Sequence, residues 1–381
     1  MMAKLGEVCK VSPSTKNIER QGAWLLNLDM VEQQTGRVVE YNFVDEDGLN
    51  ASITQFDTEN VLYSKLRPNL NKVVLPERNG FCTSELLPLR PDARKLDRSY
   101  LAVFLRSDGF VNWAVSKTAG AKMPRLGTKD LLNANIPLPE IKEQKAIAEK
   151  FEKLEELIFL RKQQIVKLDE LVKARFVEMF GDCRHNPKGW QTKTVEDIAF
   201  VGSSKRVFVE ELQTDGIPFY RGTEVGALAE KKAINPELFI TEEHYNQLCT
   251  MSGKPQKGDL LMPSICPDGR IWIVDTDAPF YFKDGRVLWV HLTSANYNSV
   301  FLLYTLKDRI MTDYASIASG TTFAELKIFA LKKCKIFDVP LELQNQFANF
   351  VERVDQQKQT VQQSLEKLEL MKKALMQEYF G

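Results

Sequence analysis

The sequence predicts an α/β (α+β) protein in which two mixed α/β globular domains are separated by a long antiparallel coiled-coil helix pair, with a pseudo-two-fold internal repeat. Residues 118–181 align without a gap with residues 318–381, and 15 of the 64 positions are identical. A segment of about 40 residues with almost no helix breakers closes each copy. The repeat is longer than the solenoid units of about 20–50 residues, so it indicates two copies of one module.

We expect four segments along the chain: a first globular domain at 1–136, a first spacer helix at 137–182, a second globular domain at 183–336 and a second spacer helix at 337–381. Short apolar runs separated by turns predict strands in both globular parts, at 61–63, 72–75, 260–262, 271–274 and 287–290. A helix is expected in each copy, at 100–106 and 300–307. These patterns predict a mixed α/β domain with a twisted antiparallel sheet in each module.

The two long helices are expected at 141–180 and 341–380, each about 60 Å long at 1.5 Å per residue. Their apolar residues recur at steps of three and four, which is the pattern of a coiled-coil seam. Pro139 and Pro340 lie at the helix entrances, and Gly181 ends the first helix. The chain must return through a compact domain between the helices, and their seam interruptions do not coincide. We therefore expect the helices to pair antiparallel within one chain.

Length, charge and cysteine spacing limit the number of domains and the kinds of site that the chain is expected to have. The 381 residues allow two to three domains, and 51 basic residues balance 51 acidic ones. A net charge of zero leaves room for a basic face offset by acidic surface elsewhere. The six cysteines include no C-x-x-C pair and have no metal-ligand spacing to the three histidines, so we expect reduced thiols and no metal. Without an apolar leader or a long apolar stretch, the chain is expected to be a cytoplasmic protein.

Three motifs carry a family resemblance. The first is the run from Asn60 to Lys72 together with that from Gly80 to Pro91, the second is Ile136-Pro-Leu-Pro-Glu140 leading into the first long helix, and the third lies at 216–224. In this order they resemble the DNA-specificity subunit of type I restriction-modification systems over essentially the whole chain. The resemblance implies two target-recognition domains, each reading one half of a bipartite, asymmetric site on double-stranded DNA.

The same resemblance implies partners and a division of labour. Two methyltransferase (modification) subunits would dock on the helices, and two restriction/translocase subunits would join them in the restricting complex. The S-adenosylmethionine cofactor is expected on the methyltransferase partner, and none on this chain. Because the two modules have diverged between Ser64-Lys-Leu-Arg67 and Pro263-Ser-Ile-Cys266, their half-sites are expected to differ.

The candidate DNA contacts are basic and polar residues in Gly-, Pro- and Ser-rich loops, where phosphate and base-edge contacts are commonly made. The loop around Gly120 and Gly320 recurs in both copies just before the spacer, which favours it as a contact. For any single Lys or Arg, a solvated surface charge is an equal alternative, and Tyr220 is also compatible with packing. The candidates are Lys65, Arg67, Lys72, Lys117, Lys122, Arg125, Lys205, Arg206, Tyr220, Arg221, Lys254, Lys257, Arg270, Thr321 and Thr322.

Two other classes of function stay open. A stand-alone DNA methyltransferase or nuclease with paired recognition domains would need catalytic signatures. Asn186-Pro-Lys-Gly189 lacks the second proline and the aromatic residue of an adenine methyltransferase loop, and neither a cofactor-binding glycine loop nor a phosphate loop is visible. A coiled-coil scaffold with two protein-binding domains would show no salt-dependent DNA binding. We therefore expect a non-catalytic recognition subunit.

Overall fold

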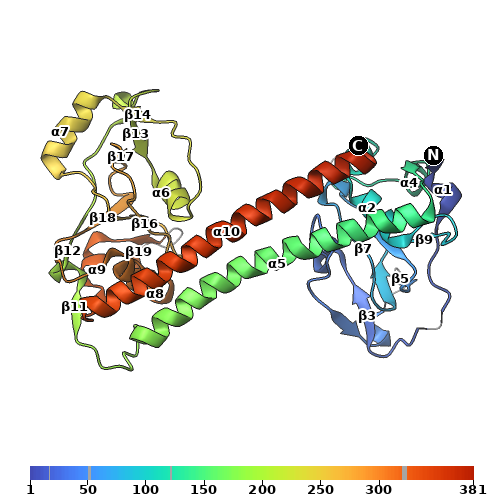
Figure 1. Cartoon of the computed structure of the whole chain (residues 1–381), viewed down its shortest axis with the longest axis horizontal. Helices are drawn as coiled ribbons and strands as arrows, with labels where there is room; N and C mark the ends of the chain where they lie inside the picture. The colour runs from blue at the N-terminus through green and yellow to red at the C-terminus, as the bar shows by residue number, and fades with distance from the viewer. Residues whose placement is uncertain (17, 50–52, 121, 320–323) are drawn as a thin grey trace. The chain divides into compact units, whose positions relative to one another are not determined.

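The computed structural model describes residues 1–16, 18–49, 53–120, 122–319 and 324–381. The chain divides into two compact units: unit 1 comprises residues 1–165 and 360–381, and unit 2 comprises residues 166–359. Each long helix is therefore shared between the units (Figure 1). Within the described residues, no helix is both long and apolar enough to cross a membrane.

Unit 1 contains two four-stranded sheets, in the orders β2-β9-β6-β7 and β4-β3-β8-β5, and a two-stranded β1-β10 pair. Helices α2 and α3 follow β9, and α4 precedes β10. The elements are β1 Met2–Lys4, α1 Leu5–Val8, β2 Cys9–Val11, β3 Ala23–Leu26, η1 Leu28–Met30, β4 Asn42–Val44, η2 Glu46–Gly48, β5 Ile53–Phe56, β6 Val61–Ser64, η3 Pro68–Leu70, β7 Val73–Val74, β8 Gly80–Thr83, β9 Leu86–Pro91, α2 Arg98–Arg106, α3 Asp108–Ser116, α4 Thr128–Leu132, β10 Asn135–Pro137 and α5 Ile141–Phe180.

Unit 2 repeats the main sheet as β12-β18-β15-β16, with a three-stranded β14-β13-β17 sheet in place of the second one. Its elements are β11 Thr192–Thr194, η4 Val195–Asp197, β12 Ala199–Gly202, η5 Val209–Glu211, β13 Ile217–Tyr220, α6 Gly222–Ala229, β14 Phe239–Ile240, α7 Glu242–Ser252, β15 Leu260–Pro263, β16 Trp272–Ile273, β17 Tyr281–Phe282, β18 Val287–Leu292, α8 Ser299–Ile317, β19 Ala318–Ser319, β20 Glu325–Leu326, α9 Ile328–Lys333, β21 Lys335–Phe337 and α10 Leu341–Phe380.

The internal repeat holds at the level of register. In unit 1, Leu89 of β9 pairs with Val11 on one side and Val61 on the other. In unit 2, Val290 of β18 pairs with Val201 and Leu260 in the same way. The expected antiparallel sheet is present in each unit, as β2-β9-β6-β7 and as β12-β18-β15-β16. The additional sheet of each unit contains a parallel pair, β3 with β8 and β13 with β17. Each parallel pair is joined by a long intervening segment, as a parallel connection requires.

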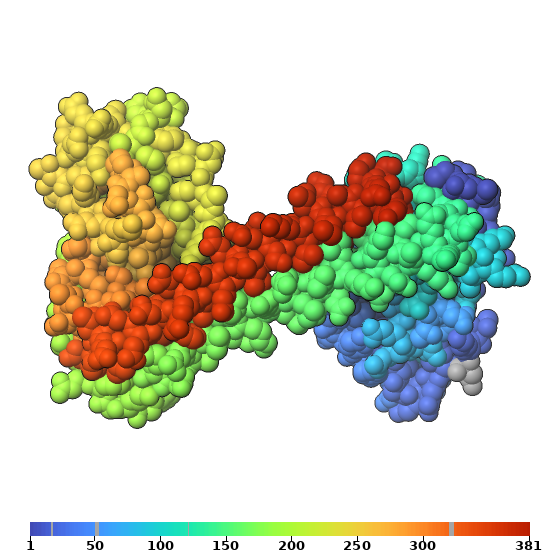
Figure 2. Space-filling view, viewed as in Figure 1, coloured from blue at the N-terminus to red at the C-terminus, as the bar shows by residue number. Residues whose placement is uncertain are grey.

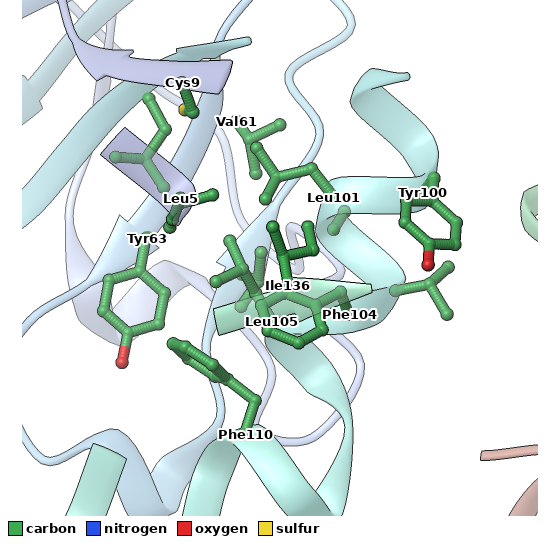
Figure 3. Close-up of a cluster of buried hydrophobic side chains, with 14 of the residues drawn as sticks. Leu5, Cys9, Val61, Tyr63, Tyr100, Leu101, Phe104, Leu105, Phe110 and Ile136 are labelled. Carbon is green, nitrogen blue, oxygen red and sulfur yellow. The ribbon is translucent and has the colours of Figure 1, made fainter. Parts of the chain in front are cut away.

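The core of unit 1 forms where α2 and α3 pack on the β2-β9-β6-β7 sheet. Tyr63 and Phe110 make an edge-on ring contact at 5.9 Å between centroids, and Leu101 and Leu105 are fully buried beside them (Figure 3). Ile136, on the last strand before α5, belongs to the same cluster. This cluster therefore includes the entry to the long helix, while Leu62, Val74 and Leu86 of the same sheet belong to a second buried cluster with Trp24 and Phe56.

The long helices occupy the predicted ranges, Ile141–Phe180 and Leu341–Phe380, and they run antiparallel. In unit 1 the beginning of α5 meets the end of α10, with Phe151 and Phe380 rings 6.3 Å apart. In unit 2 the end of α5 meets the beginning of α10, with Phe180 and Phe347 rings 5.5 Å apart. The red turns of α10 lie beside the green turns of α5 in each unit (Figures 1 and 2).

A buried glutamine at the start of each long helix fixes it to its globular part. Gln144 is fully buried: its side-chain oxygen accepts the Asp97 backbone N–H at 2.8 Å, and its Nε2 donates to the carbonyls of Lys95 and Pro139, both at 2.9 Å. Gln344 repeats this arrangement in unit 2 with the N–H of Asn298 at 2.9 Å. Each glutamine thereby holds the N-cap residue of an earlier helix of its unit, Asp97 of α2 or Asn298 of α8.

A candidate nucleic-acid interface

In unit 1, two basic loops are held together by backbone hydrogen bonds. The N–H of Leu126 donates to the carbonyl of Lys65 at 2.9 Å, and the N–H of Arg67 donates to that of Pro124 at 2.8 Å. Arg67 adopts a left-handed conformation with φ of 48°, which turns the chain into η3 directly after β6. The loop after β6 and the loop before α4 therefore form one surface that carries Lys65, Arg67 and Arg125.

Two further candidates flank this surface. Lys117 caps the C-terminus of α3, and Lys122 lies in the same loop as Arg125; both are exposed. One carboxylate interrupts the basic set, because Glu85 pairs with the guanidinium of Arg125 at 3.1 Å. The unit 1 basic surface, defined as Lys65, Arg67, Lys117, Lys122 and Arg125, therefore keeps a positive excess, which suits a polyanion.

Lys72 does not belong to this surface. Its ammonium group donates a hydrogen bond to the carbonyl of Leu28, and the side chain is only partly exposed. Burial lowers the pKa of Lys72, while the nearby Asp29 raises it in part. Lys72 stays a candidate contact, but a cation already bonded inside its own domain is less well placed for a phosphate than the exposed cations of the loops.

Unit 2 repeats the loop framework with different side chains. The N–H of Leu326 donates to the carbonyl of Ser264 at 2.7 Å, as that of Leu126 does to Lys65. By the same correspondence Arg67 is replaced by the buried Cys266, and Arg125 by Glu325. Thr321 and Thr322, expected at the tip of this loop, lie outside the described residues. The local framework is shared, whereas the charge it presents is not.

The cations of unit 2 gather elsewhere, around the hydroxyl of Tyr281. That hydroxyl accepts the backbone N–H of Lys205 at 2.8 Å and lies 3.3 Å from Oγ of Ser252 at the end of α7. The segment 205–206 is thereby fixed next to the turn that carries Lys254 and Lys257, whose side chains are exposed. Arg206 is also exposed and lies 3.5 Å from the carboxylate of Asp284. These four cations define the unit 2 basic surface.

Three unit 2 candidates have structural roles that the sequence did not separate from contacts. Tyr220 stacks on Phe280 with ring centroids 5.1 Å apart, and its burial raises the pKa of the phenol. Arg221 is bound by Glu224 at 2.6 Å, and these hydrogen bonds raise its pKa. Arg270 is paired with Asp268 at 2.8 Å. Tyr220, Arg221 and Arg270 therefore stay candidates, each already engaged within its own unit, Tyr220 by packing and the two arginines by carboxylates.

Sequence reasoning missed Arg286, an exposed residue at the edge of the repeated loop framework in unit 2. Its guanidinium pairs with Glu325, and its backbone carbonyl accepts the N–H of Ser264 at 2.8 Å. It stands where unit 1 has Glu85, whose carbonyl accepts the N–H of Lys65 at 3.0 Å. A comparison of the two copies at an offset of 201 would have found it, because β9 and β18 are shifted by one residue relative to the long helices.

The profile of the type I restriction modification DNA specificity domain matches residues 1–170 and again residues 187–370. The two matches cover most of the chain and correspond to its two modules. The chain belongs to the type I restriction-modification DNA specificity family. This result agrees with the resemblance carried by the motifs at 60–91, 136–145 and 216–224.

Curated relatives agree with the family assignment. The chain is 30% identical over 124 residues to the type I restriction enzyme EcoDI specificity subunit of Escherichia coli, a match that spans 32% of this chain and 27% of that protein. It is 24% identical over 323 residues to the MjaVIII specificity subunit of Methanocaldococcus jannaschii, spanning 78% of this chain and 73% of that protein. The match to the Escherichia coli protein thus spans about a quarter of its length.

Solved structures share the fold. A chain from a structure described as the basis of complex assembly and conformational transition of the type I R-M system has a TM-score of 0.62 at 18% identity, covering 100% of this chain and 97% of that one. The type I restriction-modification S subunit from M. genitalium has a TM-score of 0.60 at 16% identity, covering 100% and 96%. The two-module architecture with two long helices is therefore the family fold.

Proposed function

We propose that this chain is the sequence-recognition subunit of a type I restriction-modification complex and reads a bipartite, asymmetric site on double-stranded DNA. The observation that carries the proposal is a repeated framework with unequal charge. Lys65, Arg67 and Arg125 of unit 1 correspond to Ser264, Cys266 and Glu325 of unit 2. Side chains of such different hydrogen-bonding type favour different bases, so each unit would read its own half-site.

We further propose that the chemistry belongs to partner subunits. In this proposal the chain binds DNA and docks two methyltransferase subunits and two restriction/translocase subunits, and S-adenosylmethionine binds to the methyltransferase. Among the described residues there is no group of three or more His, Cys, Asp or Glu side chains that could hold a metal ion. Burial raises the pKa of Cys9, Cys82, Cys183 and Cys266 to about 12, so these thiols stay protonated and are poor nucleophiles.

The test is to map methylated bases in a host that carries the chain with its methyltransferase, and in the same host without the chain. A bipartite motif with unlike halves, methylated only when the chain is present, is the expected result. Replacing residues 183–336 by those of a relative should then change one half of the motif and leave the other half and the gap intact. A motif in which both halves change together would contradict independent reading.

A further inference from the structure

Two consecutive apolar residues are exposed on unit 2, in the segment between β12 and β13. Phe208 is 57% exposed and Val209 is 77% exposed. Single exposed apolar residues are ordinary, but this pair lies one residue after the cations Lys205 and Arg206. We propose that Phe208, supported by Val209, is a wedge that enters the DNA base stack at the half-site contacted by unit 2. The inference rests on the proposed function and deepens it.

The backbone holds this pair in one conformation. The N–H of Phe208 donates to the carboxylate of Glu211 at 2.7 Å, and the N–H of Glu211 donates back to the carbonyl of Phe208 at 3.1 Å. The N–H of Leu212 closes the turn on the carbonyl of Val209 at 3.2 Å. A side chain presented on such a closed 3₁₀ turn loses little backbone freedom on binding, as an inserting residue requires.

The flanking residues anchor the turn in the core. Val207 and Leu212 both pack against the buried cluster that contains Phe219, Tyr245 and Leu248. Because the residues on either side of the pair are turned inward, Phe208 and Val209 are directed outward. Their exposure is thus a consequence of how the turn is fixed, and burying them against unit 2 would require breaking that packing.

Cations surround the pair. Arg206 lies with its guanidinium 5.9 Å from the centre of the Phe208 ring, and the Tyr281 hydroxyl fixes Lys205 beside the end of α7, after which Lys254 and Lys257 follow. Among the residues that the structure describes, neither Lys205 nor these two lysines has an ion-pair partner. Glu210 and Glu211 are the acidic residues on the same turn, and Asp284 pairs with Arg206. The three lysines therefore outnumber these two carboxylates.

An apolar tip within a set of unpaired lysines matches how proteins deform duplex DNA. Such proteins insert Phe, Leu, Ile, Met or Pro between base steps, while Lys and Arg hold the adjacent phosphates. A purely apolar protein partner would leave the lysines unmatched, whereas a duplex offers both a stacked apolar interior and a line of negative charge. The combination of an exposed apolar side chain with neighbouring lysines therefore favours duplex DNA as the partner of this surface.

The test uses the full chain bound to its methyltransferase, with duplexes of the mapped motif that carry 2-aminopurine at successive positions of the unit 2 half-site. Its fluorescence rises when a base is unstacked. We expect a rise at one step other than the methylated adenine, which a methyltransferase itself extrudes. Phe208→Ala should remove that rise but change affinity by only about threefold, because the wedge's contacts and the unstacking it causes offset one another.

Two variants control the measurement. Phe208→Leu keeps an apolar wedge and should restore the rise. Phe329→Ala removes another phenylalanine of unit 2, 72% exposed and also beside a cation, and should leave the signal unchanged. If the wild-type complex binds the motif specifically but shows no unstacked step there, or if Phe208→Ala retains the rise, the wedge is disproved. Absence of specific binding by the wild-type complex would instead overturn the proposed function itself.

Discussion

Arg125 pairs with Glu85 at 3.1 Å in unit 1, and the corresponding pair in unit 2, Glu325 with Arg286, has the two charges exchanged. Both pairs join the loop before the last short helix of the module to the turn that leads into the central strand, β9 or β18. Two main-chain hydrogen bonds beside them recur in both units, one to the carbonyl of Glu85 or Arg286 and one to that of Lys65 or Ser264. The third differs, because the N–H of Cys266 donates to the hydroxyl of Tyr314 at 3.3 Å, where that of Arg67 donates to the carbonyl of Pro124. The framework has therefore been retained while the electrostatic potential above it has been changed.

The first prediction concerns phosphate contacts on the unit 1 basic surface. Lys65→Ala and Arg67→Ala should each lower the slope of log affinity against log salt by about one, because each would remove one counterion-releasing contact. The measurement is a salt titration of DNA binding by the complex. Lys72→Ala is the matched control, since its ammonium is bonded to Leu28, and it should leave the slope unchanged. An equal effect of all three substitutions would contradict the assignment of this surface.

The second prediction concerns the buried glutamines. Gln144→Leu should lower the free energy of unfolding by about 2–4 kcal/mol, because it leaves the N–H of Asp97 and two carbonyls without their buried partner. Gln344→Leu should act similarly in unit 2. Denaturant unfolding provides the measurement, and Gln163→Leu at an exposed position of the same helix is the control. A Gln144→Leu protein as stable as the control variant would show that these bonds contribute little.

The third prediction concerns acid sensitivity. Burial of Glu224 raises its pKa, but hydrogen bonds from Arg221 outweigh that effect, and the pKa falls from 4.5 to about 2. A carboxylate with a lowered folded-state pKa stabilises the fold above pH 4.5, and this contribution is lost as the pH falls towards 2. Glu224→Gln should therefore flatten the loss of stability between pH 4.5 and 2. Parallel wild-type and variant unfolding curves over this window would contradict the sign.

The fourth prediction concerns the gap between half-sites. One heptad inserted after Ile165 and another after Gln359, where the helices pass between the units, should preserve the seam. The unread gap should lengthen by about three base pairs, since seven residues add about 10 Å at 1.5 Å each. The readout is the methylated motif. Two-residue insertions at the same places should break the seam instead. A stable heptad variant that methylates only the motif with the original gap would show that helix length does not set the gap.

The long helices could be predicted to the residue because their signals are local. Breaker-free sequence, three-four spacing and flanking prolines all lie within the segment itself. Near the helix ends, Phe176 and Phe180 of α5, and Met376 and Phe380 of α10, are buried. Phe180 and Phe380 also contact core aromatics of their units, Phe301 and Tyr100 respectively. A heptad pattern alone does not show which apolar residues turn towards a neighbouring domain.

The candidate interface was only partly predictable. The sequence shows which side chains are charged, but not which of them are already bonded to other groups of the same unit. The pairing of Arg221 with Glu224 could have been suspected from their spacing of three residues at a helix start. The bond from Lys72 to Leu28 joins positions 44 residues apart and depends on how the residue before β7 is placed against η1, so no local pattern reveals it. Likewise, the parallel pairing of β3 with β8 is a tertiary choice between distant strands.

The exchanged charges of Arg125–Glu85 and Glu325–Arg286 also bear on how such chains can recombine. A crossover that transfers a whole unit carries both members of a pair and keeps them compatible. A crossover between repeats that falls between the two members would place Glu85 beside Glu325, or Arg125 beside Arg286, and like charges at the same loop junction repel. We therefore expect exchanges of whole modules, with breakpoints in the long helices or at their entrances, to preserve these ion pairs, and exchanges within a module to break them.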